Sequence, residues 1–162
     1  MRYRVRVTKD YLVFSSGHFI TYSGNRCERL HGHNYRASVE IEDELDENHY
    51  VFDFILLKDL TREIVDELDH RMLLPTKNRL IHVERAEEQI EVRYNDNRWS
   101  FPSGDCVLLP IANTTAELLA SYILERLLRS IADRGLPRPK RASVEVEESF
   151  GQSAFAETEE TS

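Results

Sequence analysis

Cysteine is scarce in this chain of 162 residues, which has only Cys27 and Cys106. Two cysteines can form one disulfide, but they cannot supply the disulfide framework of a small secreted domain. The opening stretch MRYRVRVTKDY alternates charged and apolar residues and lacks the apolar run of a signal peptide. We therefore expect free thiols and a cytoplasmic location.

Long apolar runs and clusters of positive charge are also missing. No run approaches the roughly 20 apolar residues that span a bilayer, so we expect no membrane partner. The formal net charge of −8 argues against a nucleic-acid surface, which needs clustered Lys and Arg. A small anionic ligand is still compatible with this charge, because a site can be locally positive on an acidic protein.

Alternating apolar residues predict strands in several places. Residues 2–8 and 11–16 resemble a hairpin joined by a turn at Thr8-Lys9-Asp10, and residues 34–41 form a third strand. The alternation returns near the end of the chain, at residues 141–150. These strands supply most of the expected sheet.

Two other segments carry apolar residues at helical spacing. The first helix is expected at residues 54–70 and the second at about 115–133, with Gly135 suited to cap the second. Between the helices, residues 76–112 are richer in strand and turn patterns, with a hairpin at QIEVRY-NDNR-WSF. Strands and helices do not alternate one for one, which predicts an α+β fold with an antiparallel sheet.

The expected domain organisation follows from these elements. We predict a single domain over residues 1–156, with a hairpin-like insertion at about 76–112. Residues 157–162 are polar and acidic, and they are expected to fray as a disordered tail.

Three histidines lie at the ends of predicted apolar strand faces. The apolar set at odd positions 35–41 extends backwards to His33 and His31, whose imidazoles would be about 6.5–7 Å apart along the chain. His18 continues the even-numbered set at 12–16 in the same way. A His-x-His pair alone is equally compatible with surface or core histidines. Three neutral imidazoles with an open position form the arrangement of a catalytic zinc site.

Cys27, four residues before His31, has two interpretations. It could be the fourth ligand of a closed, structural zinc site. It could instead be a thiolate base whose pKa is lowered from about 8.5 by the nearby cation. The spacing does not separate the two. Cys106 precedes an apolar run and is expected to be an ordinary buried cysteine.

Two acidic positions complete the candidate residues. Glu148 follows Val144 and Val146 on one strand face, and an inward carboxylate needs donors from a ligand or an arginine. If the strand bulges or ends earlier, Glu148 lies in water instead. Asp69 and His70 directly follow the first helix, but adjacency alone is weak support for an acid–base relay.

The ordered motifs FSSGH, CERLHGHNY, VFDFILLKDL, ELDHRML, TAELLA and VEVEES resemble the 6-pyruvoyltetrahydropterin synthase and 6-carboxytetrahydropterin synthase family. They cover most of the chain outside residues 76–112, which are longer than the matching loop of compact members. The resemblance implies a tunnelling fold, in which antiparallel strands backed by two helices close into a barrel when subunits associate. Members are typically hexamers of two stacked trimers, with active sites between subunits.

The resemblance also implies site roles. Glu117 matches a recurring family position, but Thr114 to Glu117 reads as a capping box, which favours a helix cap. The implied roles are zinc binding by His18, His31 and His33, proton abstraction by Cys27, a proton relay through Asp69 and His70, pterin anchoring by Glu148 and a pterin contact by Thr115.

The implied activity is the zinc-dependent conversion of 7,8-dihydroneopterin triphosphate to 6-carboxy-5,6,7,8-tetrahydropterin, as in queuosine and deazapurine synthesis. The three-residue gap between Cys27 and His31 resembles the carboxy-type enzymes, whereas animal pyruvoyl-type enzymes have a longer gap. The alternatives are pyruvoyl-type triphosphate elimination, a related pterin side-chain lyase, or a non-catalytic subunit that binds zinc or pterin.

Overall fold

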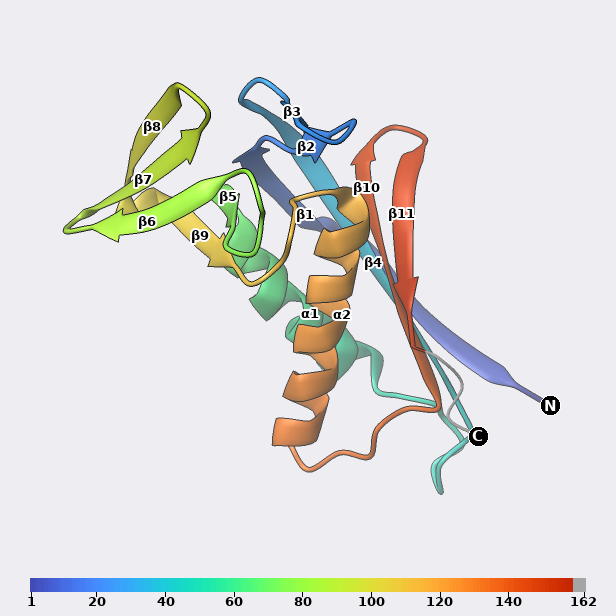
Figure 1. Cartoon of the computed structure of the whole chain (residues 1–162). Helices are drawn as coiled ribbons and strands as arrows, with labels where there is room; N and C mark the ends of the chain where they lie inside the picture. Colours follow the sequence, from blue (N-terminus) through green and yellow to red (C-terminus); the bar gives the residue numbers. More distant parts are fainter. Residues whose placement is uncertain (159–162) are drawn as a thin grey trace.

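Eleven strands and two α-helices make up the described chain, residues 1–158 of the computed structural model (Figure 1). Both helices lie against one face of the largest sheet. The helices are α1 Phe54–Leu68 and α2 Ala116–Asp133, with a short 3-10 helix at Ser103–Asp105. The strands are β1 Tyr3–His18, β2 Thr21–Tyr22, β3 Arg26–Cys27, β4 His31–Asp43, β5 Arg71–Pro75, β6 His82–Ala86, β7 Gln89–Tyr94, β8 Asn97–Pro102, β9 Cys106–Leu109, β10 Arg141–Ser149 and β11 Gln152–Glu157.

The main sheet has six strands in the order β11-β10-β4-β1-β5-β9. Its first four strands are antiparallel to one another, whereas β1, β5 and β9 run parallel. The α+β class and the two covering helices are confirmed, but the expectation of a wholly antiparallel sheet is wrong. The segment with α1 carries the chain from β4 past β1, and β5 pairs with β1 on the side away from β4.

β1 is one long strand, so the hairpin expected around Thr8-Lys9-Asp10 is wrong. The register against β4 shifts between Thr8 and Val13, which is the mark of a β-bulge. The buried residues are odd-numbered before the shift, as at Val7, and even-numbered after it, as at Leu12. The buried positions therefore change from odd to even numbers across the bulge, and the strand continues without a turn.

The two predicted helices are confirmed close to their expected bounds. Asp53 caps α1, because its carboxylate accepts hydrogen bonds from the backbone N–H groups of Ile55 and Leu56. Gly135 follows α2 with φ +70°, and its N–H donates to the carbonyl of Ala132. The apolar stripes of both helices are buried against the sheet; they include Leu57, Leu60, Ile64, Leu68, Leu119, Ile123, Leu127 and Ile131.

The insertion between β5 and β9 contains a separate antiparallel sheet in the order β6-β7-β8. The predicted hairpin is present as β7 and β8, and β6 was not predicted. In Figure 1 this small sheet stands at the same end of the molecule as β2 and β3. It has its own hydrophobic cluster, here called the second cluster, whose buried members are Phe19, Met72, Leu74, Ile81, Ile90, Val92 and Tyr94.

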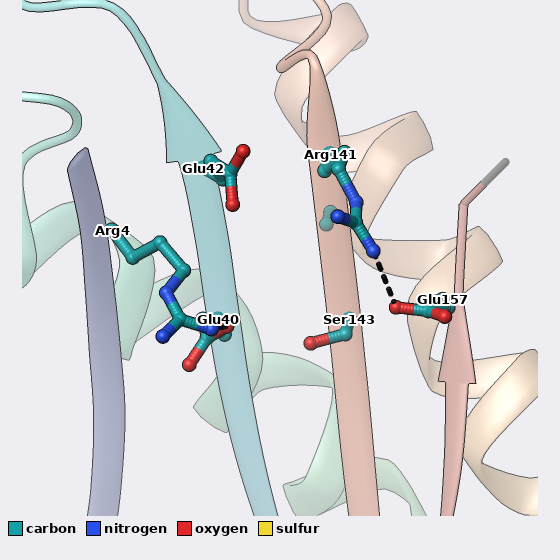
Figure 2. A pocket seen from close by; sticks show the side chains of 7 residues that line it. Arg4, Glu40, Glu42, Arg141, Ser143 and Glu157 are labelled. Carbon is teal, nitrogen blue, oxygen red and sulfur yellow. Dashed lines mark hydrogen bonds and ion pairs between the residues drawn. The ribbon is translucent and has the colours of Figure 1, made fainter. Parts of the chain in front are cut away.

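The face of the main sheet that the helices leave uncovered carries paired charges (Figure 2). The guanidinium of Arg4 lies 2.9 Å from Glu40, and that of Arg141 lies 3.0 Å from Glu157. Such exposed pairs contribute little to stability, typically about 0–1 kcal/mol each. These charged pairs make this face of the sheet polar, so among the described residues it carries no apolar core.

The end of the chain is ordered further than the sequence suggested. Glu157 still pairs with Ser143, and the N–H of Thr158 donates to the carbonyl of Ala142 at 2.9 Å. Residues 157 and 158 of the expected tail thus belong to the paired edge of the sheet, and the remainder, residues 159–162, lies outside the described residues. Among the residues described, neither helix has the length and apolar character needed to cross a membrane.

Candidate metal centre and active site

Three histidines and one glutamate meet at one end of the main sheet. His18 on β1 lies directly opposite His31 on β4, and Ser16 lies opposite His33. Because β4 begins at His31, both β4 histidines lie on its odd-numbered, inward face, in agreement with the parity argument. Glu148 on β10 joins them, and the candidate ligand atoms of all four side chains lie within 4.8 Å of one another.

Backbone contacts fix the hydrogen positions on two of the rings. Nδ1 of His18 lies 2.9 Å from the carbonyl of Thr114, and Nδ1 of His31 lies 2.8 Å from that of Arg29. A carbonyl only accepts, so each Nδ1 carries the hydrogen and each Nε2 of a neutral ring has a free lone pair. This is the orientation that metal-binding histidines adopt.

The two free nitrogens then face each other. Nε2 of His18 and Nε2 of His31 are 3.2 Å apart, and His18 is 1% exposed. Burial, together with the charges that His31 and His33 carry when protonated, lowers the pKa of His18 to about 4. The His18 ring is therefore neutral near pH 7, and its Nε2 offers a lone pair toward His31. A cation could be bound by both nitrogens.

His33 supplies the third imidazole nitrogen, and Glu148 lies beside it. Oε1 of Glu148 lies 2.8 Å from Nε2 of His33 and 3.5 Å from Nε2 of His18. The His33 nitrogen is buried, and among the described residues it has no well-directed hydrogen bond despite that short contact. Three imidazole nitrogens match the protein ligands of a catalytic zinc site, whose fourth position stays open for water or substrate. The residues therefore fit the metal.

Glu148 points inward, as the strand parity predicted. The other possibility, an exposed Glu148 beyond a bulge, is wrong even though the β10–β11 register does shift between Glu147 and Ser149. Glu147 points elsewhere and accepts a hydrogen bond from the N–H of Gly151 at 3.2 Å. The sequence suggested donors from a ligand or an arginine, and the neighbours of Glu148 among the described residues include His18 and His33.

Cys27 lies on β3 and pairs with Thr21 on β2. Its side chain packs against the second cluster, and it is not in the ligand group of the described residues. A closed site with Cys27 as the fourth ligand is thus not what this arrangement offers. Burial, with the adjacent charge of Glu28, raises the pKa of the thiol.

Glu28 is a site residue that the sequence reasoning missed. Its Oε2 lies 3.8 Å from Nε2 of His31, so a carboxylate borders the metal centre from the same loop that carries Cys27. The available signal was its position three residues before a predicted ligand. That signal is weak, because the loop between β3 and β4 has no period from which side-chain direction can be read.

Asp69 and His70 form the hydrogen bond that their adjacency suggested. Nδ1 of His70 donates to Oδ2 of Asp69 at 2.8 Å, and Oδ1 accepts from the N–H of Ser15 at 2.7 Å. Burial by itself raises the pKa of Asp69, but these hydrogen bonds outweigh it and the pKa is lowered. His70 has a positive φ of 54° and is largely exposed. His70 and His33 line one open cleft of about 530 Å³.

The start of α2 differs from the predicted capping box. Thr115 is the N-cap, and its hydroxyl accepts from the N–H of Leu118. Thr114 is not the cap, because its hydroxyl donates to the carbonyl of Phe19 and its own carbonyl holds His18. Glu117 therefore lies one position earlier in the helix than a capping box requires, although its charge still suits the first turn.

Comparison by sequence identifies clear relatives. The profile of the 6-pyruvoyl tetrahydropterin synthase family matches residues 6–159. A Methanocaldococcus jannaschii protein assigned as a 6-carboxy-5,6,7,8-tetrahydropterin synthase is 33% identical over 144 residues, 88% of each chain. A Pyrococcus abyssi protein with the same assignment is 34% identical over 131 residues, 80% of this chain and 76% of its own.

Comparison by structure gives the same group. The crystal structure of 6-pyruvoyl tetrahydropterin synthase from Plasmodium vivax superposes with a TM-score of 0.90 and 30% identity, covering 98% of both chains. A second Plasmodium vivax structure, at 29% identity with the same TM-score and coverage, is a mutant in which a glutamate described as a catalytic residue is replaced by alanine. Both structures also span the β6-β7-β8 insertion, as their coverage requires.

Proposed function

The chain belongs to the 6-pyruvoyl tetrahydropterin synthase family, and we propose that it is a zinc-dependent lyase that converts 7,8-dihydroneopterin triphosphate to 6-carboxy-5,6,7,8-tetrahydropterin. The convergence of three histidines and Glu148 carries this proposal. The assignment of two archaeal relatives as 6-carboxytetrahydropterin synthases supports the carboxy-type product. The three-residue gap between Cys27 and His31 points the same way.

The histidines supply the metal-binding part of the mechanism. His18, His31 and His33 would hold zinc through their Nε2 atoms, two of which are already oriented by Nδ1–H bonds to carbonyls. Bound zinc supplies Lewis-acid polarisation of the substrate's side-chain hydroxyls, which makes the neighbouring C–H more acidic. The burial of His18 excludes water from one side of this centre.

A base must then remove the proton from carbon. We propose Cys27 for this role, which the family resemblance implies, and Glu28 as a second acid–base group. Glu28 is supported by its 3.8 Å approach to His31, and the Plasmodium vivax enzyme is a family member in which a glutamate is described as catalytic. Burial and Glu28 raise the pKa of the Cys27 thiol in the metal-free protein, and a cation bound nearby would favour its thiolate. Turnover of Cys27→Ala and Glu28→Gln, measured separately, assigns the roles.

Three further residues are given supporting roles. His70, held by Asp69 through Nδ1, keeps its other ring nitrogen open for proton exchange with the substrate. Glu148 would anchor the pterin ring through its two carboxylate oxygens. Thr115, at the start of α2 beside the His18 contact, is proposed as a further pterin contact.

Product analysis tests the proposal directly. The zinc-loaded protein is incubated with 7,8-dihydroneopterin triphosphate, and the products are identified by chromatography and mass spectrometry. We expect 6-carboxy-5,6,7,8-tetrahydropterin. A 6-pyruvoyl product would favour triphosphate elimination, another pterin would favour a related side-chain lyase, and binding without turnover would favour a non-catalytic subunit.

We further propose that the protein is a hexamer of two stacked trimers, located in the cytoplasm and serving deazapurine synthesis. The outermost strands β11 and β9 each have one neighbour among the described strands, so both edges of the main sheet are open to pairing. Closure through neighbouring subunits would satisfy them. Light scattering should give six times the 19.0 kDa chain mass, and a stable monomer at micromolar concentration would contradict the assembly.

A further inference from the structure

The hairpin of β2 and β3, residues 21–27, leads directly into Glu28 and the histidines of β4. Each of its strands has only two residues, with Thr21 opposite Cys27 and Tyr22 opposite Arg26. A hairpin this short does not hold its shape in water by its own pairing. Its position must therefore be set by what it packs against.

Hydrogen bonds from other parts of the chain hold the hairpin in place. The hydroxyl of Tyr94, at the end of β7, donates to the carbonyl of Asn25 in the turn of the hairpin. Thr21 is held by two asparagines: Asn78 donates to its hydroxyl at 3.1 Å, and Asn113 donates to its carbonyl at 2.9 Å. Two of these three partners, Tyr94 and Asn78, belong to the insertion between β5 and β9.

Apolar contacts come from the same insertion. The ring of Phe19, just before the hairpin, stacks on Trp99 of β8 with centroids 4.7 Å apart and planes 27° apart. The Cys27 side chain packs on the second cluster, to which β7 contributes three buried side chains. The sulfur that the family resemblance makes the base thus packs on a cluster to which the small sheet contributes.

The insertion is not needed to complete the main sheet. β5 and β9 pair directly as parallel neighbours, with Pro75 opposite Leu109, and the small sheet forms no strand pairs with them. Its inward side chains face the second cluster, and its outward side carries ion pairs such as Arg93 with Glu84 at 2.9 Å. The buried side of the small sheet therefore contacts the hairpin and the strands beneath it.

We propose that the β6-β7-β8 sheet is a positioning element of the active site, and that Tyr94 is a positioning residue for Cys27 and Glu28. By fixing Asn25, Tyr94 sets where the next residues enter the metal centre. The inference rests on the proposed function, because it concerns the groups that would move the proton. Proton transfer needs heavy atoms within about 2.6–3.2 Å, and a misplacement of about 1 Å can cost 100-fold in rate.

Tyr94→Phe tests the inference, because the ring keeps its place in the second cluster while the hydroxyl is lost. We expect kcat to fall by roughly fivefold or more, since a looser loop places the base less often in a reactive position. The substrate KM and the zinc content per chain should not change, since the histidines are held by β1 and β4. Hydrogen exchange of residues 19–30 should accelerate, while exchange in α2 should not.

Two variants accompany it. Trp99→Leu removes the stacking on Phe19 and should give the same loss of kcat with zinc retained. Arg93→Gln breaks an ion pair on the outward side of the same strand, so its kcat and its exchange at residues 19–30 should match the parent protein. Unchanged exchange and unchanged kcat in Tyr94→Phe would overturn the inference. Zinc loss in Tyr94→Phe would also overturn it, because the role would then not be confined to the hairpin.

The proposed function and the positioning role of the small sheet can be refuted independently of each other. If the parent protein does not turn over 7,8-dihydroneopterin triphosphate, the proposed function fails. The exchange experiment still decides whether the small sheet holds the hairpin. If the parent protein is active and Tyr94→Phe equals it, only the positioning role fails.

Discussion

The Nε2 atoms of His18 and His31 face each other at 3.2 Å, while each opposite ring nitrogen is bonded to a backbone carbonyl. The pair is therefore preset for a metal ion that both nitrogens bind. Strand pairing produces this geometry, because the two residues are direct partners across β1 and β4. A cross-strand pair holds its side chains about 5 Å apart at Cβ, which suits convergence on one ion.

The metal should depend on the histidines and not on the thiol. We expect His31→Ala to lose most of its zinc, and Cys27→Ala to stay fully loaded and lose turnover. The physical reason is that Cys27 packs on the second cluster and lies outside the ligand group. Metal analysis of both variants checks this, with His82→Ala on the exposed β6 as control. Zinc loss in Cys27→Ala would instead support a closed Cys-His site.

Glu148 and Glu147 form a matched pair of neighbours on opposite strand faces. Glu148→Gln should weaken binding of a pterin analogue at least about tenfold, or ~1.4 kcal/mol, because the new amide places a donor against the pterin's own N–H donors. Zinc should remain bound by the three histidines. Glu147→Gln should bind as the parent protein does. Calorimetric titration measures both, and equal affinities would mean that Glu148 is not the pterin anchor.

Asp69 should make the unfolding free energy of the protein depend on pH. Its folded pKa is lowered, so its contribution is present above the unfolded value of about 3.9 and is lost as pH falls through the folded pKa. Asp69→Asn removes that dependence. We expect the variant's deficit in unfolding free energy to be constant near pH 6 and to shrink below about pH 4. Urea unfolding from pH 6 to pH 3 measures it, and a constant deficit at all pH values would contradict the assignment.

The protein should be more stable when Tyr35 lacks its hydroxyl. Its ring is fully buried and stacked on Phe14, and its hydroxyl has no hydrogen-bond partner among the described residues. Burial and the charge of Glu148 raise its pKa, so the phenol stays neutral. Tyr35→Phe should raise the unfolding free energy of the metal-free protein by about 1 kcal/mol, because an unpaired buried hydroxyl is costly. Urea titration measures the change.

The matched control is Tyr94→Phe, whose hydroxyl does have a partner in Asn25. That variant should lose about 1 kcal/mol in the same titration. If Tyr35→Phe is also destabilised, the Tyr35 hydroxyl has a partner in solution.

The inward histidines and Glu148 could be predicted because alternation along a strand is a local property. Once β4 is known to start at His31, the faces of its residues follow from counting. The buried positions change from odd to even between Val7 and Leu12, but a turn and a bulge both produce such a change. Only the pairing of β1 with β4 on both sides of the irregularity decides that.

Other features depend on long-range pairing or on irregular backbone. β5 is a short apolar run whose parallel place beside β1 is set by the path of α1 over the sheet. β11 exists because β10 offers it an edge, and its own sequence QSAFAE is a weak strand signal. The directions of Cys27 and Glu28 are set by the small sheet and the hairpin, for which the sequence offers no periodic pattern.

The pairing of β1 with β4 also has a consequence for synthesis on the ribosome. These two strands carry all three histidines and are complete once the first part of the chain has emerged, whereas Glu148 lies on β10 near the end. The nascent chain therefore contains all three histidines before Glu148 has emerged, although the Thr114 carbonyl that orients His18 also comes later than β4. Chains released before β10 would keep the ion-binding histidines but lack the residue proposed to hold the substrate.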